Sequence, residues 1–391
     1  MTEPVSIRRS VETDLLEGSA FRQFVLKIHS RCDLACDHCY VYTMADQRWR
    51  ARPIVMTRSV VEQTTYRIAE HVRAHSPTSI DVVLHGGEPL LAGPARIAHC
   101  VAGIRAAVGT VAAVDFTLQT NGVLLDADYH RLFRRLGIRV SVSLDGDRVA
   151  QDRHRRRRDG RGSHADVVRA LRDLSSGRFR SLFSGLLCTI DLRNDPVTTY
   201  ESLLEFRPPA VDFLLPHGNW LRPPPMRDHG SSETPYAEWL IAVFDRWYGA
   251  TPQETRVRKF DEIIHVALGG RSGVEGIGVN QPATIVVETD GAIERSDMLT
   301  AAYEGAGSTG LHVADDSFDA ALTRFVPQRR ADVCADCDLY RICGGGLYAH
   351  RFGPERDFDN ESVYCPDLYR LISHIRSRLI HDVAALRSSA P

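Results

Sequence analysis

The chain has 391 residues, 43% of them hydrophobic, and a formal net charge of −2 at pH 7. Its length predicts about two or three domains, and its nearly balanced charge excludes the strongly basic field that attracts nucleic acid or an anionic membrane. The sequence contains neither an apolar signal segment near its start nor a run of roughly 18 apolar residues, so we expect a cytoplasmic protein without membrane spans.

Short β-rich runs alternate with helical patterns over the first half of the chain, which predicts repeated β/α units around a parallel sheet. The expected strands are Phe21–His29, Ile80–Leu84, Val114–Gln119, Val140–Leu144, Leu182–Ile190 and Val211–Leu215. A capping box of Ser59 and Glu62 is expected to start the first long helix. Ligands of parallel α/β folds bind at the carboxyl ends of the strands, so the loops after these six strands are the candidate site.

The pattern changes after a connector rich in Pro, Gly and Ser. Tyr236–Tyr248 is predicted to be an amphipathic helix, and TIVVETDGAIERSDML to be a hairpin that turns at Asp290 and Gly291. We expect four parts: an N-terminal arm over residues 1–20, a barrel over 21–222, a bridging helix and hairpin over 223–320, and a cysteine-containing domain over 321–391.

Cysteines cluster in the loop after the first expected strand, SRCDLACDHCY, which holds Cys32, Cys36 and Cys39. Clustered thiols in a reducing compartment indicate metal or redox chemistry rather than disulfides. Two centres fit three thiolates. One is Zn²⁺ with His29 or His38 as fourth ligand, and the other is a [4Fe–4S] cluster whose fourth iron stays open for a substrate or cosubstrate.

The CxxxCxxC spacing on this loop resembles the radical S-adenosylmethionine (SAM) superfamily. That resemblance implies an α/β fold with a partial (β/α)6, TIM-like barrel, in which SAM binds the open iron and is cleaved to a 5′-deoxyadenosyl radical. It also implies that Gly86, Gly87 and Glu88 of GGEP bind the SAM amino group, and that Ser143 and Asp145 bind the ribose hydroxyls.

Two further SAM contacts follow from the resemblance. Arg155 matches the arginine of a family HDxxR element and would pair with the SAM carboxylate, although Gln151 stands where that element has histidine. Ile190, at the end of LLCTI, matches the strand that faces adenine.

A second group of cysteines, Cys334, Cys337, Cys343 and Cys365, has the spacing C-x2-C-x5-C-x21-C. Spacing alone leaves zinc and a fully ligated Fe–S cluster open. Beside a radical SAM barrel it resembles the SPASM extension, which implies an auxiliary [4Fe–4S] cluster. Leu347 and Ser296 stand where a full SPASM domain has further cysteines. We therefore expect two clusters per chain, one that binds SAM and one auxiliary.

Asp297 is the candidate general base, because sulfatase-maturing members of the family have an aspartate directly after the hairpin cysteine that Ser296 replaces. Glu294 is the second candidate. The downstream segments resemble SPASM peptide maturases that form cyclophanes, in which an aromatic ring carbon of Trp, Phe or Tyr is joined to a side-chain β-carbon. The other readings are a different radical SAM peptide oxidation, such as sulfatase maturation or thioether formation, and a zinc-stabilised binding protein without catalytic activity.

The implied partners are a ribosomally made precursor peptide and an external one-electron donor of the flavodoxin or ferredoxin type. His217, Asn219 and Trp220 follow the sixth expected strand and are the candidate peptide contacts. The arginine run at 153–158 contains no aromatic residue, so neither nucleic acid nor a membrane is an expected partner.

Overall fold

The computed structural model describes residues 20–228, 230–279, 284–325 and 329–388. The expected arm over 1–20 falls outside these ranges except for its last residue. Among the described helices, none combines the length and the apolar character needed to cross a membrane.

A single sheet of ten strands forms the centre of the described part of the chain, in the order β10-β9-β8-β1-β2-β3-β4-β5-β6-β7. The strands are β1 (Gln23–His29), β2 (Ser79–Gly86), β3 (Ala113–Thr120), β4 (Ile138–Ser143), β5 (Phe183–Thr189), β6 (Ala210–Leu214), β7 (Arg256–Val257), β8 (Thr284–Val287), β9 (Ala292–Glu294) and β10 (Ser308–His312). Strands β1 to β6 are the six predicted strands, each within two residues of its expected bounds, and they pair in parallel.

The sheet is wider than the sequence suggested, because the bridging region adds strands to it. β7 pairs in parallel with β6, and β8 pairs in parallel with β1, with Phe24 opposite Ile285. The predicted hairpin is present as β8 and β9, which turn at Gly291, a glycine with a φ of +96°. The hairpin therefore continues the barrel sheet instead of standing apart from it.

The two faces of the sheet differ in character, as the two-residue period of a strand requires. Phe24, Leu26 and Ile28 of β1 are at most 1% exposed and belong to the apolar core beneath the helices. The alternate residues Gln23 and Val25 line a cavity on the inner face. The sheet thus buries one apolar face and keeps a mixed polar face for the interior.

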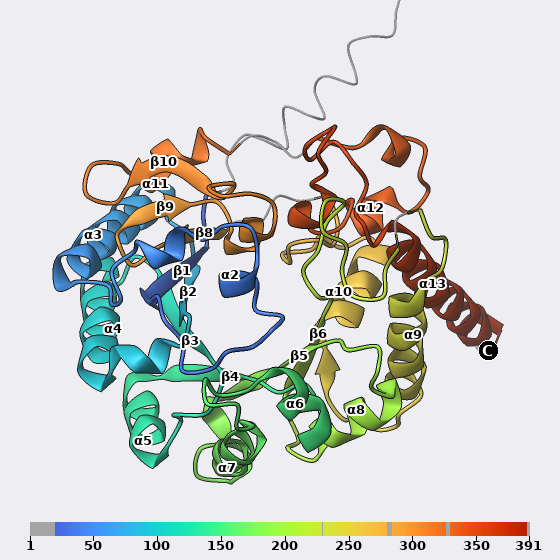
Figure 1. Cartoon of the computed structure of the whole chain (residues 1–391), viewed down its shortest axis with the longest axis horizontal. Helices are drawn as coiled ribbons and strands as arrows, with labels where there is room; N and C mark the ends of the chain where they lie inside the picture. The colour runs from blue at the N-terminus through green and yellow to red at the C-terminus, as the bar shows by residue number, and fades with distance from the viewer. Residues whose placement is uncertain (1–19, 229, 280–283, 326–328, 389–391) are drawn as a thin grey trace, which may run out of the picture.

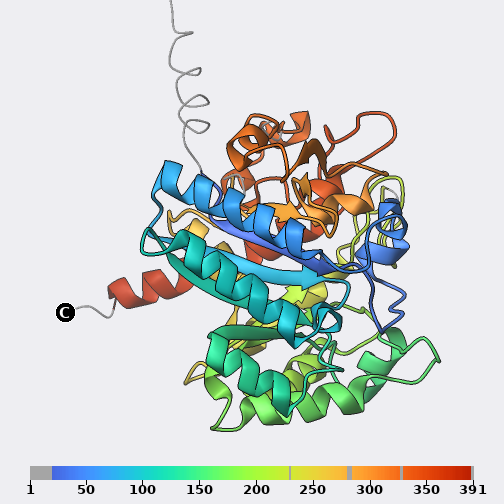
Figure 2. The same cartoon turned by 90° about the vertical axis from the view of Figure 1, so that its left-hand side faces the viewer.

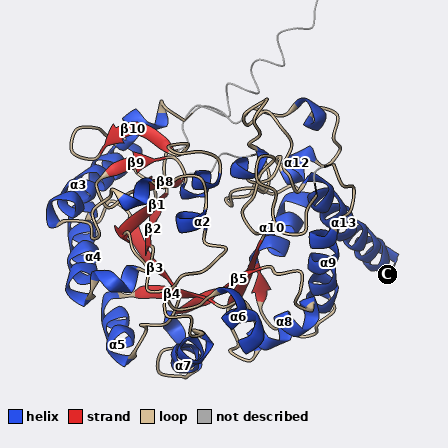
Figure 3. Ribbon diagram, viewed as in Figure 1, coloured by secondary structure: helices blue, strands red, loops and turns tan. Residues whose placement is uncertain are grey.

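Helices cover the outer, apolar face of the sheet, so that strands form an inner arc and helices an outer one (Figure 1, Figure 3). Figure 2 shows the same strands and helices from the side. The helices are α2 (Tyr40–Thr43), α3 (Arg58–His75), α4 (Pro94–Val108), α5 (Ala127–Leu136), α6 (Arg148–His154), α7 (His164–Ser175), α8 (Pro196–Leu204), α9 (Pro235–Tyr248), α10 (Arg258–Ala267), α11 (Phe318–Leu322), α12 (Tyr340–Cys343) and α13 (Cys365–Ser388), with short 3-10 turns η1 (Arg48–Arg50), η2 (Pro89–Ala92), η3 (Arg180–Leu182), η4 (Asp297–Ala301), η5 (Asp332–Cys334) and η6 (Tyr348–Arg351).

The predicted helix at 236–248 is confirmed as α9, whereas the predicted start of α3 is wrong. Ser59 lies inside α3, and the N-cap is Thr57, whose hydroxyl accepts a hydrogen bond from the Val60 amide. Thr57 is the N-cap because its backbone is extended, as an N-cap requires, whereas Ser59 already lies in the first turn of the helix.

Candidate active site

A cavity of about 470 Å³ occupies the interior of the sheet and extends to the carboxyl ends of the parallel strands. It is lined by inward residues of β1 to β6 and β8, by the loop after β1, and by residues of the C-terminal part of the chain. This is the place where the sequence predicted the site. The bridging and cysteine-containing parts close the side that a six-stranded barrel leaves open.

The cysteine loop forms one wall of this cavity. Cys32, Cys36 and Cys39 all line it, on the segment between β1 and α2. Burial raises the pKa of each of the three thiols, and for Cys36 it reaches about 11. A bound metal centre would therefore have to stabilise the thiolates that the surrounding protein disfavours.

Two glycines of the GGEP sequence lie so close to the backbone at His29 and Arg31 that a side chain would not fit at either position. A Cβ on Gly86 would lie 2.1 Å from the carbonyl oxygen of His29, and one on Gly87 would lie 2.5 Å from that of Arg31. The Gly87 amide donates a hydrogen bond to the His29 carbonyl over 2.8 Å. Glycine is needed here because the backbone after β2 presses directly against the cysteine loop.

The third residue of this element, Glu88, lies behind the cavity wall. Its carboxylate accepts hydrogen bonds from the Thr120 hydroxyl (2.8 Å), the Asn121 amide (2.8 Å) and the Leu90 amide (3.0 Å). Burial raises the pKa of Glu88 to about 7 against these hydrogen bonds. Glu88 thus ties the loops after β2 and β3 together, while Gly86 and Gly87 line the cavity. Its contact with SAM stays a prediction.

Of the other expected SAM contacts, two line the cavity and two are buried behind its wall. Ser143 and Arg155 line the cavity, whereas Asp145 is 2% exposed and Ile190 is packed in the apolar core. Asp145 accepts two hydrogen bonds from the Arg155 guanidinium, at 2.6 and 3.1 Å, and one from the Thr189 amide. Burial works to raise the pKa of Asp145, but the Arg155 charge outweighs it and lowers the pKa.

Gln151, which departs from the family's histidine, has a structural role that the sequence did not reveal. It is fully buried, and its side-chain oxygen accepts a hydrogen bond from the Asp145 amide at 2.8 Å. Its side-chain nitrogen donates to the Ser163 hydroxyl. Gln151 therefore holds the loop that presents Asp145 to Arg155.

Asp297, the candidate base, lines the cavity at the start of η4. Its carboxylate forms an ion pair with Lys27 of β1 and accepts a 2.6 Å hydrogen bond from the Tyr40 hydroxyl. Burial acts to raise the pKa of Asp297, but the Lys27 charge and these hydrogen bonds outweigh it and hold the pKa well below the ordinary value. Asp297 is thus held ionised at neutral pH.

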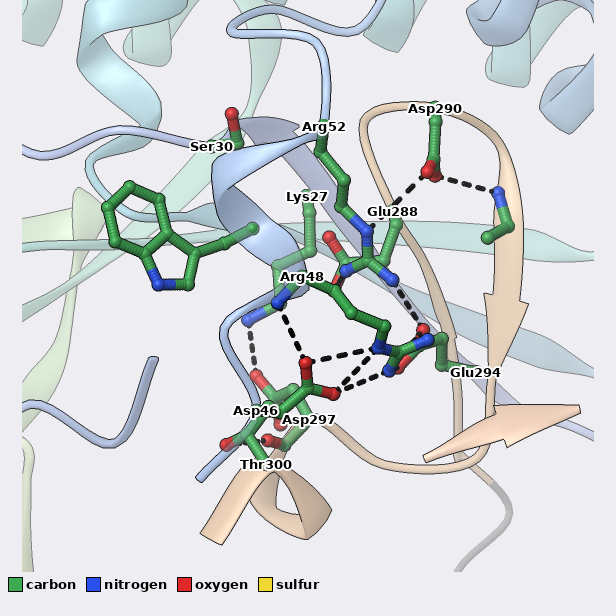
Figure 4. Close-up of polar contacts among 12 residues, drawn as sticks. Lys27, Ser30, Asp46, Arg48, Arg52, Glu288, Asp290, Glu294, Asp297 and Thr300 are labelled. Atoms are coloured by element: carbon green, nitrogen blue, oxygen red, sulfur yellow. Dashed lines mark hydrogen bonds and ion pairs between the residues drawn. The ribbon is translucent and has the colours of Figure 1, made fainter. Parts of the chain in front are cut away.

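Glu294, the second candidate, lies in a neighbouring network of buried charges (Figure 4). Its carboxylate pairs with Arg48 and Arg52, and Arg52 also pairs with Glu288 at 2.8 Å. Arg48 in turn binds Asp46 at 2.6 Å. Because the arginines precede α3 and the glutamates flank the hairpin turn, this network fastens the hairpin to the segment after the cysteine loop.

Another carboxylate, which the sequence did not single out, also faces the cavity. Glu275 lines it and accepts a long, 3.4 Å hydrogen bond from the Ser296 hydroxyl. Burial and, after it, the charge of Asp297 raise the pKa of Glu275 to about 7. The same cavity therefore contains an ionised carboxylate and one that changes protonation near neutral pH.

The candidate peptide contacts lie at different depths. His217 lines the cavity between the rings of Tyr40 and His350, with centroids 5.0 and 5.4 Å away, and burial lowers its pKa to about 4. Asn219 is 1% exposed and donates to the Ala301 carbonyl, while the Trp220 indole donates to the Glu361 carbonyl. These two order the loops around the cavity, and their contact with a peptide stays a prediction.

The second cysteine group is brought together from three elements. Cys334 ends η5, Cys343 ends α12 and Cys365 begins α13, with Cys337 between the first two. Burial, followed by the charges of Cys343, Cys334, Glu361 and Cys337, raises the pKa of Cys365 to about 12. Four free thiols contributed by neighbouring segments match in number the donor set of a four-thiolate metal centre, and their role as ligands stays a prediction.

This group also presses on the cavity wall. A Cβ on Gly344, next to Cys343, would lie 1.8 Å from the Gly278 carbonyl oxygen, and the Gly278 amide donates to the Ile342 carbonyl. Ser296 and Leu347, which stand where a full SPASM domain has cysteines, both face the cavity. The positions that hold cysteines in a full SPASM domain are thus part of the cavity wall in this chain.

Residues 26–197 match the family model of the radical SAM superfamily. This segment is similar to the radical SAM superfamily. With this match, the α/β fold with a C-terminal domain and the enzyme class predicted from the cysteine motif are confirmed.

Similar proteins extend over nearly the whole chain. The cysteine-type anaerobic sulfatase-maturating enzyme of Clostridium perfringens is 23% identical over 90% of this chain and 95% of its own length, and the serine-type enzyme of Bacteroides thetaiotaomicron is 21% identical over 88% and 86%. Among solved structures, anSMEcpe with bound AdoMet superposes with a TM-score of 0.78 at 20% identity, over 93% of this chain and 99% of that one. Streptococcus suis SuiB bound to S-adenosylmethionine gives 0.56 at 13% identity, over 87% and 76%.

The buried charge network supplies a stability prediction. Arg52→Ala leaves Glu288 and Glu294 buried without a shared cation, which costs about 3–5 kcal/mol in the free energy of unfolding. Denaturant unfolding of the variant measures this loss. Arg161→Ala is the control, because Arg161 is 75% exposed and pairs with Asp159 at the surface, and its midpoint should not move. Equal midpoints for the two variants would contradict the role given to the network.

Glu275 supplies a pH prediction. Its folded-state pKa, about 7, lies above that of an unfolded glutamate, about 4.3, so its contribution to stability is complete at low pH and is lost as pH rises through 7. Glu275→Gln should flatten the fall in unfolding free energy between about pH 4.3 and 7 by about 3 kcal/mol. Glu62→Gln, at a side chain that is 68% exposed, should keep the original slope. An unchanged slope in Glu275→Gln would show that Glu275 does not titrate in this range.

Proposed function

We propose that this protein is a radical SAM maturase that modifies a ribosomally made precursor peptide by forming a C–C crosslink between an aromatic ring and a side-chain β-carbon. The observation that carries the proposal is the single cavity that the three-cysteine loop, Ser143, Arg155 and Asp297 all face. A peptide side chain in that cavity would meet the radical-generating centre and a proton acceptor at once. SuiB, which has the same fold, was crystallised with its precursor peptide SuiA.

The cofactors follow from the donor sets. Cys32, Cys36 and Cys39 would hold a [4Fe–4S] cluster with one iron open to SAM, and the four C-terminal cysteines would hold an auxiliary [4Fe–4S] cluster. Gly86, Gly87, Ser143 and Arg155 would contact SAM from the cavity wall. When bound, the cluster and SAM would supply a 5′-deoxyadenosyl radical able to take a hydrogen atom from a β-carbon of the peptide.

A residue of the chain can accept the proton that the proposed reaction releases. After a carbon radical adds to an aromatic ring, one electron and one proton must leave for the ring to recover its aromaticity. The Asp297 carboxylate is ionised in the resting protein and can accept that proton. Lys27 compensates the charge of the Asp297 carboxylate, and the Tyr40 hydroxyl fixes its orientation. The acceptor is therefore already in place before the peptide reacts.

The second candidate function is oxidation of a cysteine or serine side chain to an aldehyde, the chemistry of sulfatase maturation. The curated relatives with that name favour it, and so does the place of Asp297 directly after the hairpin position. Crosslinking is favoured by Ser296 and Leu347, which stand where a full SPASM domain has cysteines. Among the described residues this leaves cysteines for one auxiliary cluster instead of two.

The cofactor content is tested by iron and sulfide analysis of anaerobically reconstituted protein. We expect about eight irons per chain, and about four in the Cys334→Ala/Cys337→Ala variant. Cys100→Ala, at a buried cysteine outside both groups, should keep all eight irons. Twelve irons, or zinc in place of the second cluster, would contradict the assignment.

The reaction is tested with a precursor peptide encoded beside this gene. We expect 5′-deoxyadenosine and a peptide about 2 Da lighter that does not fragment between the two joined residues. Because oxidation of serine gives the same mass change, a hydrazide probe must accompany the measurement. An adduct with the hydrazide would establish an aldehyde and exclude the crosslink.

The role of Asp297 has its own prediction. Asp297→Asn should lower the rate of product formation by about 10²-fold while SAM cleavage continues, because the proton acceptor is lost and not the radical source. Glu294→Gln, in the structural network, is the matched carboxylate control and should keep turnover once its folding is verified by circular dichroism. Full turnover by Asp297→Asn would exclude it as the base.

A further inference from the structure

A second cluster of metal-binding side chains lies outside the cavity, on the outer layer of helices. His71 and His75 are one turn apart on the same face of α3. Asp319, on α11, reaches across to both of them. Its Oδ1 lies 2.6 Å from His71 Nδ1 and 2.8 Å from His75 Nε2. Three potential ligands from two elements far apart in sequence thus converge on one point.

The spacing of these atoms suits a divalent transition metal. The three ligand atoms all lie within 4.8 Å of one another. A tetrahedral Zn²⁺ holds its ligands at about 2.0–2.2 Å, so neighbouring ligand atoms are about 3.3 Å apart. The two present contacts need to open by only about half an ångström to admit the ion, and the fourth position would belong to water.

The surroundings hold one ligand firmly and leave the others able to adjust. The His71 ring is 1% exposed and packs against Phe21, Phe24 and Phe318, with centroids 5.6, 6.0 and 6.3 Å away. Burial lowers the pKa of His71, which favours the neutral imidazole that binds metals. The side chains of His75 and Asp319 are 30% and 45% exposed, so an ion can enter from solvent.

The arginine one turn before His71 is bound by other partners and does not pair with the Asp319 carboxylate. Arg67 lies one turn before His71 on α3, and its guanidinium is bound to Glu70 and to the carbonyls of Val313 and Ala314. The charge of Asp319 is therefore directed to the two histidines. Two imidazoles and one carboxylate are ligands that Zn²⁺ and its neighbours in the first transition series accept, whereas Mg²⁺ and Ca²⁺ prefer oxygen.

We propose that His71, His75 and Asp319 form a binding site for a divalent transition metal of the Zn²⁺ type, separate from both cysteine groups. The metal would join α11 to α3, which pack together at the edge of the barrel (Figure 1). It would thereby fasten the segment between the hairpin and the cysteine-containing domain to the first long helix of the barrel. The proposal does not depend on the reaction that the enzyme catalyses.

The test uses the cluster-loaded protein without a histidine tag, so that the thiols are occupied. Zn²⁺ is titrated by calorimetry into the parent protein and into His75→Ala and Asp319→Asn, whose altered side chains are partly exposed and tolerate replacement. We expect one Zn²⁺ per parent chain and at least a tenfold weaker affinity in each variant. His381→Ala, at an exposed histidine on α13, should bind as the parent does.

A second measurement separates this site from residual thiols. Co²⁺ at a site of two histidines and one carboxylate gives visible d–d bands without the intense thiolate charge-transfer absorption, and those bands should vanish in His75→Ala. Equal Zn²⁺ affinity in the parent and both variants would overturn the proposal. A parent protein that binds no Zn²⁺ under these conditions would overturn it as well, since Asp319 would then only link the two histidines by hydrogen bonds.

Discussion

The parallel pairing of β8 with β1 is the interaction on which the site depends. It places a hairpin from residues 284–294 beside the first strand of the barrel, more than 250 residues away in sequence. Lys27 can meet Asp297 only because of this pairing, and Arg52 meets Glu288 and Glu294 for the same reason. Backbone hydrogen bonds thus position the charges, and the charges then hold the hairpin in place (Figure 4).

Much of the barrel could be predicted from the sequence because its signals are local. Strands β1 to β6 are apolar, β-branched runs with loops rich in glycine and polar residues, and α9 begins with a proline and has a clear apolar face. β7 and β8 were not assigned to the barrel sheet, because strands of two and four residues have little periodicity and their partners are distant in sequence. The start of α3 was misplaced because Thr57 and Ser59 both have side chains that can cap a helix.

Residue spacing predicts the candidate ligands of the site but not its supporting residues. Cysteine spacing picks out two groups of thiols without knowledge of the fold, and the structure places the first group along the cavity, while their role as metal ligands stays a prediction. The sequence does not tell which residue of a loop faces inward, and Glu88 and Asp145 turn behind the cavity wall to bind neighbouring loops. Lys27 and Glu275 carry no motif, since their importance arises only from what the folded chain places beside them.

The contact between Gly344 and Gly278 links the auxiliary cysteines mechanically to the reaction chamber. Glu275 is three residues before Gly278, so a change at these cysteines would shift the wall that carries this carboxylate. Under the proposed function, loss of turnover after removal of those cysteines would have two origins, an interrupted path for electrons and a displaced substrate pocket. Redox titration and peptide-binding measurements on the same variant would assign the defect to one of them.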